Sequence, residues 1–102
     1  MKPRIVVAAT GASGAIYTKV LLDKLVTLKQ QYSEVSLVFS NNAQQIWKEE
    51  IGNENFLQYP FQYFDKHNFY APFASGSSLY NVMLIVPCSM GTLGRIASGV
   101  SD

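Results

Sequence analysis

The stretch RIVVAATGASG, residues 4–14, joins an apolar run of strand length to a loop of small residues. Two further apolar, β-branched runs lie at Val35 to Ser40 and at Val82 to Pro87. Because none of these runs alternates with polar residues, they are typical of parallel strands that are covered on both faces. The sequence therefore predicts an open α/β domain with a parallel sheet.

A helix is expected after each of the three runs. Residues 42–51 and 90–97 have helical character, and residues 15–30 form the expected crossover helix after the first strand. In this crossover helix we expect Lys19, Asp23 and Lys24 to face away from an apolar side, which consists of Ile16, Val20, Leu21, Leu25 and Leu28.

Composition excludes several classes of protein. The 102 residues suffice for one domain at most, and a content of 48% hydrophobic and 15% charged residues is typical of a globular protein. The net charge of +1 comes from scattered side chains, so nucleic acid is not an expected partner. The first apolar run is too short for a signal peptide or a membrane span, which favours a cytoplasmic protein. Cys88 is the single cysteine, so no disulfide and no cysteine-based metal site are expected. We expect the Cys88 side chain to pack in the core.

Aromatic side chains are concentrated before the third run. Nine of the thirteen aromatic residues fall between Phe56 and Tyr80. Two interpretations stay open at this point. The rings can cover one end of the sheet, or they can form an interface or a lid over a ligand.

Three loops rich in Gly, Ser, Thr and Asn follow the three runs, at residues 10–14, 40–42 and 87–92. In a parallel sheet these loops emerge at the same carboxyl edge, where ligands bind. Small residues let backbone N–H groups approach an anion, and helix N-termini add partial positive charge. Taken singly, each loop is better explained by ordinary helix caps than by contact with a ligand. The convergence of three, with Gly11, Gly14 and Gly91, favours a phosphate site.

Motifs that the sequence lacks narrow the class of nucleotide that these loops can bind. Gly14 is followed by Ala15 and Ile16, so the Lys of a nucleotide-triphosphate loop is missing. The first loop also lacks the Gly-x-Gly-x-x-Gly pattern, and the second strand ends on Ser40 instead of an acidic residue, which disfavours NAD. A mononucleotide with one phosphate remains, and a flavin suits the aromatic-rich surroundings.

Four motifs of this chain resemble the UbiX-type flavin prenyltransferases of the flavoprotein family. They are TGASGAIY at 10–17, SNNA at 40–43, APFASGS at 71–77 and PCSMGTL at 87–93, and they occur in the family's order. The resemblance implies a Rossmann-like, flavodoxin-like three-layer domain that binds FMN. It also implies transfer of a dimethylallyl group from dimethylallyl phosphate to reduced FMN. Prenylated FMN then serves a UbiD-type decarboxylase, as in ubiquinone biosynthesis. Family members form homo-oligomers, such as dodecamers, and the reaction needs no metal.

The same resemblance implies the site residues. Ser13 and Glu50 match a polar pair that relays protons near the flavin, whereas from sequence alone Glu50 is a solvated helix residue. A substrate-pocket motif consists of Ala74, Ser75, Gly76 and Ser77. The FMN-binding positions are Gly11, Ala12, Ser13, Ser40, Ser89, Met90, Gly91 and Thr92.

Family members continue for roughly as long again beyond the position of Asp102. We therefore expect residues 1–102 to be the N-terminal part of a truncated FMN-binding domain, without the half that holds the prenyl phosphate, and to be inactive alone. Two alternatives stay open. An FMN-dependent decarboxylase of cysteine-containing substrates is disfavoured, because it would carry a Ser-Ala-Asn-Thr turn where residues 88–92 stand. The other alternative is a fragment that binds flavin and catalyses nothing.

Overall fold

The structure is a computed structural model that describes residues 2–64 and 82–88. Its elements, in chain order, are β1 (Arg4–Ala9), α1 (Ala15–Thr27), β2 (Glu34–Phe39), α2 (Asn41–Ile51), the 3₁₀ helix η1 (Asn55–Gln58), β3 (Gln62–Phe64) and β4 (Val82–Ile85). The three expected strands and the first two expected helices are all present, with bounds close to those predicted. The helix expected at residues 90–97 lies outside the described residues.

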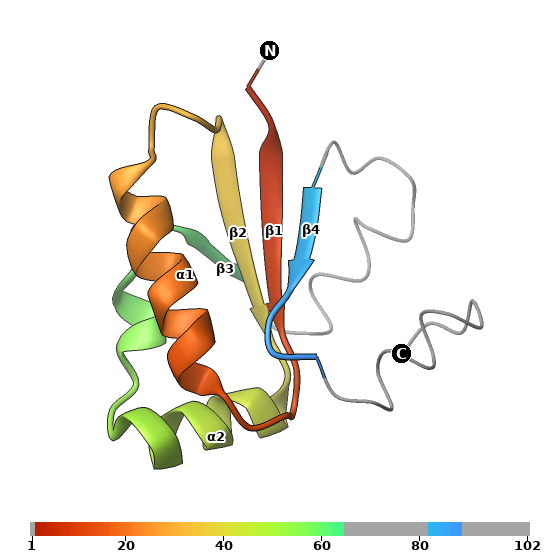
Figure 1. Cartoon of the computed structure of the whole chain (residues 1–102), viewed down its shortest axis with the longest axis vertical. Coiled ribbons are helices and arrows are strands. Elements are labelled where there is room, and N and C mark those ends of the chain that lie inside the picture. Colours follow the sequence, from red (N-terminus) through yellow and green to blue (C-terminus); the bar gives the residue numbers. More distant parts are fainter. Residues whose placement is uncertain (1, 65–81, 89–102) are drawn as a thin grey trace, which may run out of the picture.

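The four strands form one parallel sheet in the order β3-β2-β1-β4 (Figure 1). β1 pairs with β2 along its whole length, from Arg4 opposite Glu34 to Ala9 opposite Phe39. The chain adds β2 and β3 on one side of β1 and then places β4 on the other side. The order of the strands therefore reverses between β1 and β4, which is the switch point where open α/β sheets bind ligands.

β3 is the strand that the sequence did not reveal. Its three residues, Gln62–Phe64, lie in the aromatic segment and pair with Ser36 to Val38 of β2. A run this short gives no distinguishable pattern, and its β character comes from pairing with the exposed edge of β2.

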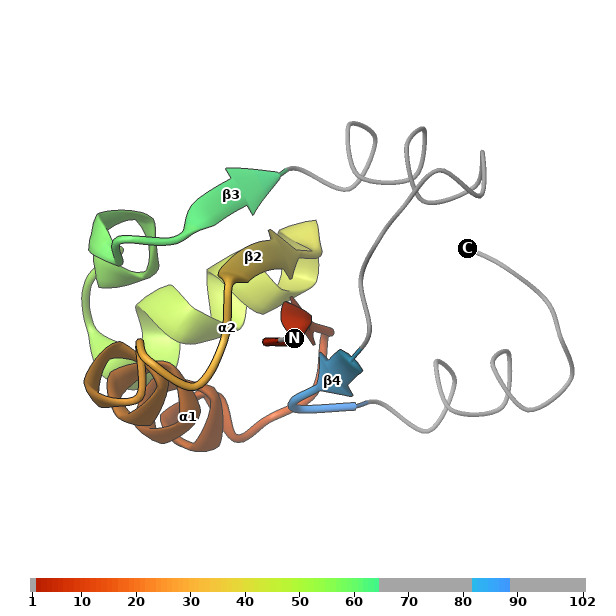
Figure 2. The same ribbon diagram turned by 90° about the horizontal axis from the view of Figure 1, so that it is seen from above.

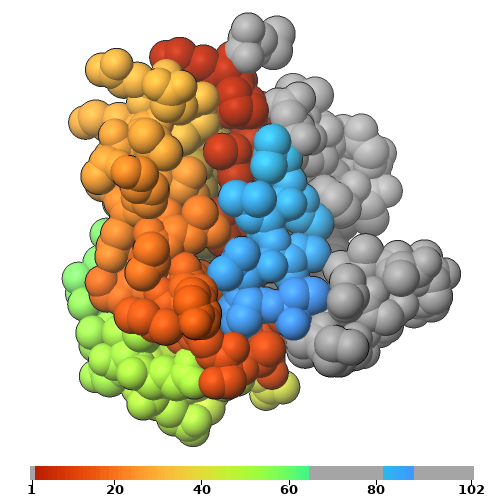
Figure 3. Space-filling model, viewed as in Figure 1, coloured from red at the N-terminus to blue at the C-terminus, as the bar shows by residue number. Residues whose placement is uncertain are grey.

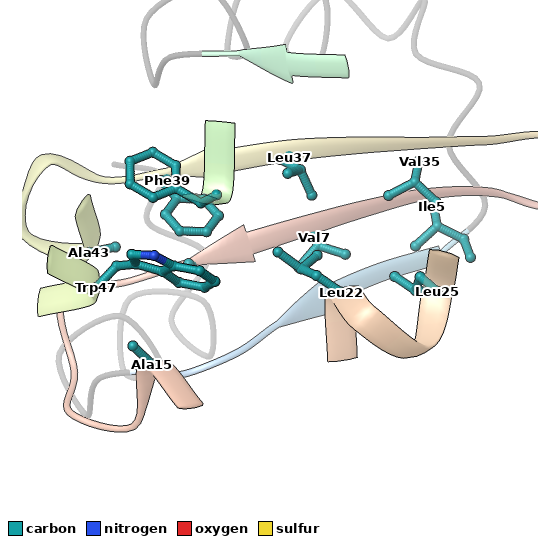
Figure 4. Packing of buried hydrophobic residues seen from close by; sticks show 12 residues of the cluster. Ile5, Val7, Ala15, Leu22, Leu25, Val35, Leu37, Phe39, Ala43 and Trp47 are labelled. Atoms are coloured by element: carbon teal, nitrogen blue, oxygen red, sulfur yellow. The ribbon is translucent and has the colours of Figure 1, made fainter. Parts of the chain in front are cut away.

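Both described helices lie on one face of the sheet, as the two perpendicular views show (Figures 1 and 2). The core fills the space between this face and the helices (Figure 4). Val7 and Leu37 contribute from the strands, and Leu22 contributes from α1; all three are fully buried. Neither helix of the described part has the length and hydrophobicity of a membrane-spanning segment.

Aromatic rings close the end of the core under α2. Phe39 stacks on Phe56 with a centroid distance of 4.8 Å and meets Trp47 edge to face at 5.9 Å. Trp47 is fully buried, and its indole N–H donates to Asn53 Oδ1 at 3.3 Å. The rings from Phe56 to Phe64 therefore pack on the sheet. For this part of the aromatic segment the structure agrees with the interpretation that the rings cover one end of the sheet. Residues 65–81, the rest of the aromatic segment, lie outside the described residues.

The predicted inner face of α1 is partly wrong. Ile16, Val20 and Leu28 are 51%, 59% and 38% exposed, whereas Ala15, Thr18, Leu22 and Leu25 are buried. Ala15 and Thr18 are small and buried, and Thr18 bonds Val86 O, so the first turns of the helix lie close to the segment after β4. The hydroxyl of Thr18 is compatible with burial because it is hydrogen-bonded.

Candidate functional site

The loops after β1 and β2 meet at the carboxyl edge of the sheet. Ser40 N donates to Ala9 O at 3.1 Å, so the two loops start side by side. A Cβ at Gly11 would lie only 2.8 Å from the Cβ of Asn42, closer than two carbon atoms pack. Gly14 has a φ of 111°, a conformation that costs glycine little and other residues much. Both glycines of the first loop are therefore required by its shape.

Ser40 caps α2. Its Oγ accepts a hydrogen bond from Ala43 N at 3.0 Å, which satisfies one of the unpaired N–H groups at the start of the helix. This contact confirms the cap interpretation for the second loop. A serine cap uses a lone pair, so the hydroxyl group can still donate its own hydrogen to an anion.

Glu50 connects the end of α2 to the start of α1. Its Oε2 accepts from Ser13 Oγ at 2.7 Å, and its Oε1 accepts from the N–H groups of Gly14 at 3.0 Å and Ala15 at 2.8 Å. The Ser13 hydroxyl, and then the N–H groups of Ala15 and Gly14, lower the pKa of Glu50. The structure thus brings Ser13 and Glu50 together. Glu50 is exposed, but it is not the unbonded, solvated side chain that the sequence alone suggests.

The position of Glu50 changes how the first loop can bind an anion. Helix N-termini attract negative charge, and here a carboxylate of the chain itself occupies the N–H groups of Gly14 and Ala15. A phosphate at the same place would lose these donors and would be repelled by the carboxylate. Of the two fully described loops, only the first has its helix N-terminus occupied by a carboxylate of the chain, and the N–H groups that follow Ser40 have no such competitor among the contacts of the described residues.

The segment after β4 reaches the same edge and is held by two threonines. Thr10 Oγ1 donates to Pro87 O at 2.6 Å, and Thr18 Oγ1 donates to Val86 O at 2.6 Å. Thr10 belongs to the first of the expected loops, although no contact was assigned to its side chain, and Thr18 was not expected at the site. The signal for Thr18 in the sequence was a polar residue among the apolar residues of a crossover helix. Cys88 is exposed, contrary to expectation, because β4 ends at Ile85 and the cysteine lies beyond the sheet.

The remaining expected site residues lie outside the described residues. They are Ala74, Ser75, Gly76, Ser77, Ser89, Met90, Gly91 and Thr92. Within residues 2–64 and 82–88, no group of His, Cys, Asp and Glu side chains is arranged to hold a metal ion. Among the described residues, the edge offers backbone N–H groups, hydroxyl groups, the side-chain amide of Asn42, the thiol of Cys88 and the carboxylate of Glu50.

Comparison with known proteins gives consistent matches. A model of the flavoprotein family matches residues 1–102. The flavin prenyltransferase UbiX of Methanocaldococcus jannaschii is 41% identical over 100 residues, which are 96% of this chain and 52% of that protein. The chain thus spans about half the length of the curated relatives it matches.

Solved structures agree with the sequence comparison. The structure of AnUbiX (PadA1) in complex with FMN and dimethylallyl pyrophosphate matches with a TM-score of 0.76 and 37% identity, over 97% of this chain and 52% of that one. A dodecameric FMN-dependent UbiX-like decarboxylase from Escherichia coli O157:H7 matches with a TM-score of 0.72 and 30% identity, over 94% and 52% of the two chains. These matches confirm the predicted flavodoxin-like α/β fold.

Proposed function

The chain belongs to the flavoprotein family, and from this membership we propose that it is the FMN-binding N-terminal part of a flavin prenyltransferase. Bound reduced FMN would supply the nucleophile that takes a dimethylallyl group from dimethylallyl phosphate, with release of phosphate. The product would serve a UbiD-type decarboxylase. The relative that contains both FMN and dimethylallyl pyrophosphate supports the cofactor and the class of substrate.

The contact between the loops after β1 and β2 carries the proposal. A Cβ at Gly11 would lie only 2.8 Å from the Cβ of Asn42, so the two loops are in direct contact. Two loops of small residues, each leading into a helix, thus meet at the edge where such sheets bind ligands. The residues present fit a mononucleotide with one phosphate.

We assign the phosphate to Ser40 and to the first N–H groups of α2. The Ser40 hydroxyl donates to a phosphate oxygen while its lone pair keeps the bond from Ala43 N. The backbone of the first loop lines the nucleotide at Gly11, Ala12 and Ser13. Ser89 to Thr92 and Ala74 to Ser77 are proposed as further FMN and substrate contacts from their motifs alone.

Ser13 and Glu50 form the proposed proton-transfer pair. The hydrogen bonds from Ser13, Ala15 and Gly14 lower the pKa of Glu50, so its carboxylate is ionised at neutral pH. The same bonds weaken it as a base, so it is suited to relaying a proton and not to retaining one. The Ser13 hydroxyl lies 2.7 Å from this carboxylate and can pass a proton to it from a flavin in the same crevice. The similarity to a dodecameric relative supports assembly of several copies.

Titration with three ligands tests the proposed function. FMN, riboflavin and NAD are each added to the chain, and binding is followed by fluorescence. We expect saturable binding of FMN, weaker binding of riboflavin because it lacks the phosphate, and no binding of NAD. Equal affinity for FMN and riboflavin would contradict the phosphate site, and absence of flavin binding would contradict the proposed function.

A further inference from the structure

Two threonine hydroxyl groups join the segment after β4 to β1 and α1. Thr10, the first residue after β1, donates to Pro87 O both from its backbone N–H at 3.2 Å and from Oγ1 at 2.6 Å. Thr18, on the inner face of α1, donates from Oγ1 to Val86 O at 2.6 Å. In the space-filling view, the start of α1 and the segment after β4 lie against each other (Figure 3).

These contacts extend the pairing of β1 and β4 beyond the end of the strands. The last paired residues are Ala8 and Ile85. The N–H of Val86 then donates to Ala8 O at 2.9 Å, and the carbonyl groups of Val86 and Pro87 accept from the threonines. Because proline has no N–H group, its carbonyl is the only backbone group by which this residue can be held. The segment is thus fixed from two elements just where it leaves the sheet.

The burial of Thr18 indicates that its hydroxyl group has a specific use. Thr18 is only 1% exposed, and valine would fill the same volume without a polar group. A threonine hydroxyl within a helix commonly bonds a carbonyl of its own helix. Thr27 does so, because its Oγ1 donates to Lys24 O at 2.7 Å. Thr18 instead bonds a carbonyl of another element, 68 positions away in the sequence.

We propose that Thr10 and Thr18 are positioning residues that hold the segments leaving β1 and β4 in fixed relative positions beside the proposed FMN site. This inference rests on the proposed function, since it takes the nucleotide to lie at the switch point between these strands. Thr10 directly precedes Gly11, Ala12 and Ser13, so its side chain joins the first of the proposed FMN loops to the segment after β4. Loss of either hydroxyl group lets one of these segments shift relative to the other.

The test compares Thr18→Val with two matched variants. Thr18→Ser keeps the hydroxyl group, and Thr27→Val removes a threonine hydroxyl from the same helix away from the switch point. We expect Thr18→Val to raise the FMN dissociation constant about tenfold. This change corresponds to the loss of roughly one hydrogen bond between loop and ligand. Thr18→Ser and Thr27→Val are expected to stay within about twofold of the parent chain.

Amide hydrogen exchange of the same proteins, without flavin, provides an independent measurement. The N–H groups of Thr10 and Val86 are expected to exchange faster in Thr18→Val than in the parent, Thr18→Ser or Thr27→Val. Unchanged exchange and unchanged FMN affinity in Thr18→Val would overturn the inference. An equal loss of FMN affinity in Thr27→Val would also overturn it, because the effect would then come from general destabilisation. Failure of the parent chain to bind FMN, with exchange responding as expected, would refute the proposed function and not the hydrogen bonds that hold the segment.

Discussion

Replacing Ser40 with Asp separates the two roles of this side chain at the start of α2. Ser40 Oγ accepts from Ala43 N at 3.0 Å, and an aspartate oxygen can accept the same bond. Asp and Ser are similarly good N-cap residues, so the free energy of unfolding should change by less than about 0.5 kcal/mol. Ser40→Ala loses the cap and should be less stable by about 1 kcal/mol.

The two variants should rank differently in FMN affinity. Either change removes the hydroxyl donor to the phosphate, which is worth roughly 1.5 to 3 kcal/mol, or about tenfold to a hundredfold in the dissociation constant. Asp also places a carboxylate beside the phosphate. At about 4 Å this repulsion is roughly 1 kcal/mol in water and about 4 kcal/mol near a protein surface, so the affinity should fall at least about fivefold further.

The assay combines urea unfolding with titration of FMN and riboflavin. Ser40→Asp should keep the parent's stability and lose the most FMN affinity, whereas Ser40→Ala should lose stability and less affinity. Riboflavin has no phosphate and should bind both variants within about twofold of the parent. An undiminished FMN affinity in folded Ser40→Asp would refute the reasoning and leave Ser40 with the role of a helix cap alone.

Two further predictions concern Glu50 and the reaction. Because the pKa of Glu50 is lowered in the folded chain, its carboxylate contributes stability that is present above the unfolded pKa of about 4.3 and is lost as the pH falls through the folded pKa. Urea unfolding of Glu50→Gln should therefore show lower stability than the parent at neutral pH, and a difference that persists in strong acid would contradict this account. In the reaction, the 102-residue chain incubated anaerobically with reduced FMN and dimethylallyl phosphate should leave the flavin unmodified, as read by mass spectrometry. Preorganised donors to a leaving phosphate are each worth ~10² to 10³ in rate, and the resemblance places them in the half of the family's length that this chain does not span. Formation of prenylated FMN at the rate of a full-length relative would show that the catalytic groups lie within the 102 residues.

The strands β1, β2 and β4 and the edge loops could be predicted because each depends on local sequence, whereas β3 could not. An unbroken apolar run identifies β1 and β2, and Gly, Ser and Asn mark the loops that follow them. Apolar spacing correctly predicted that α1 is a helix. It placed Leu25 correctly on the buried side of α1, but it put Ile16 and Val20 there in place of the small residues Ala15 and Thr18. The first turns lie close to the segment after β4, where Thr18 bonds Val86 O, and this favours the small pair.

Contacts between distant residues could not be predicted in this way. Glu50 lies 37 positions from Ser13, and the two meet only because α1 and α2 pack on the same face of the sheet. The hydrogen bonds of Thr10 and Thr18 with the segment after β4 depend likewise on the strand order. The pairing of Ser13 with Glu50 was predicted from the family resemblance and not from the residues alone.

Amide chemical shifts, followed in an isotope-labelled chain during FMN addition, test most directly whether the carboxyl edge binds the flavin. The account predicts saturable shifts at residues 11–14 and 40–43, in the loops after β1 and β2. The loop of residues 28–33, which precedes β2 at the opposite edge of the sheet, should not respond. Saturable shifts at residues 28–33 with none at the first two loops, or no saturable shift anywhere, would contradict the account.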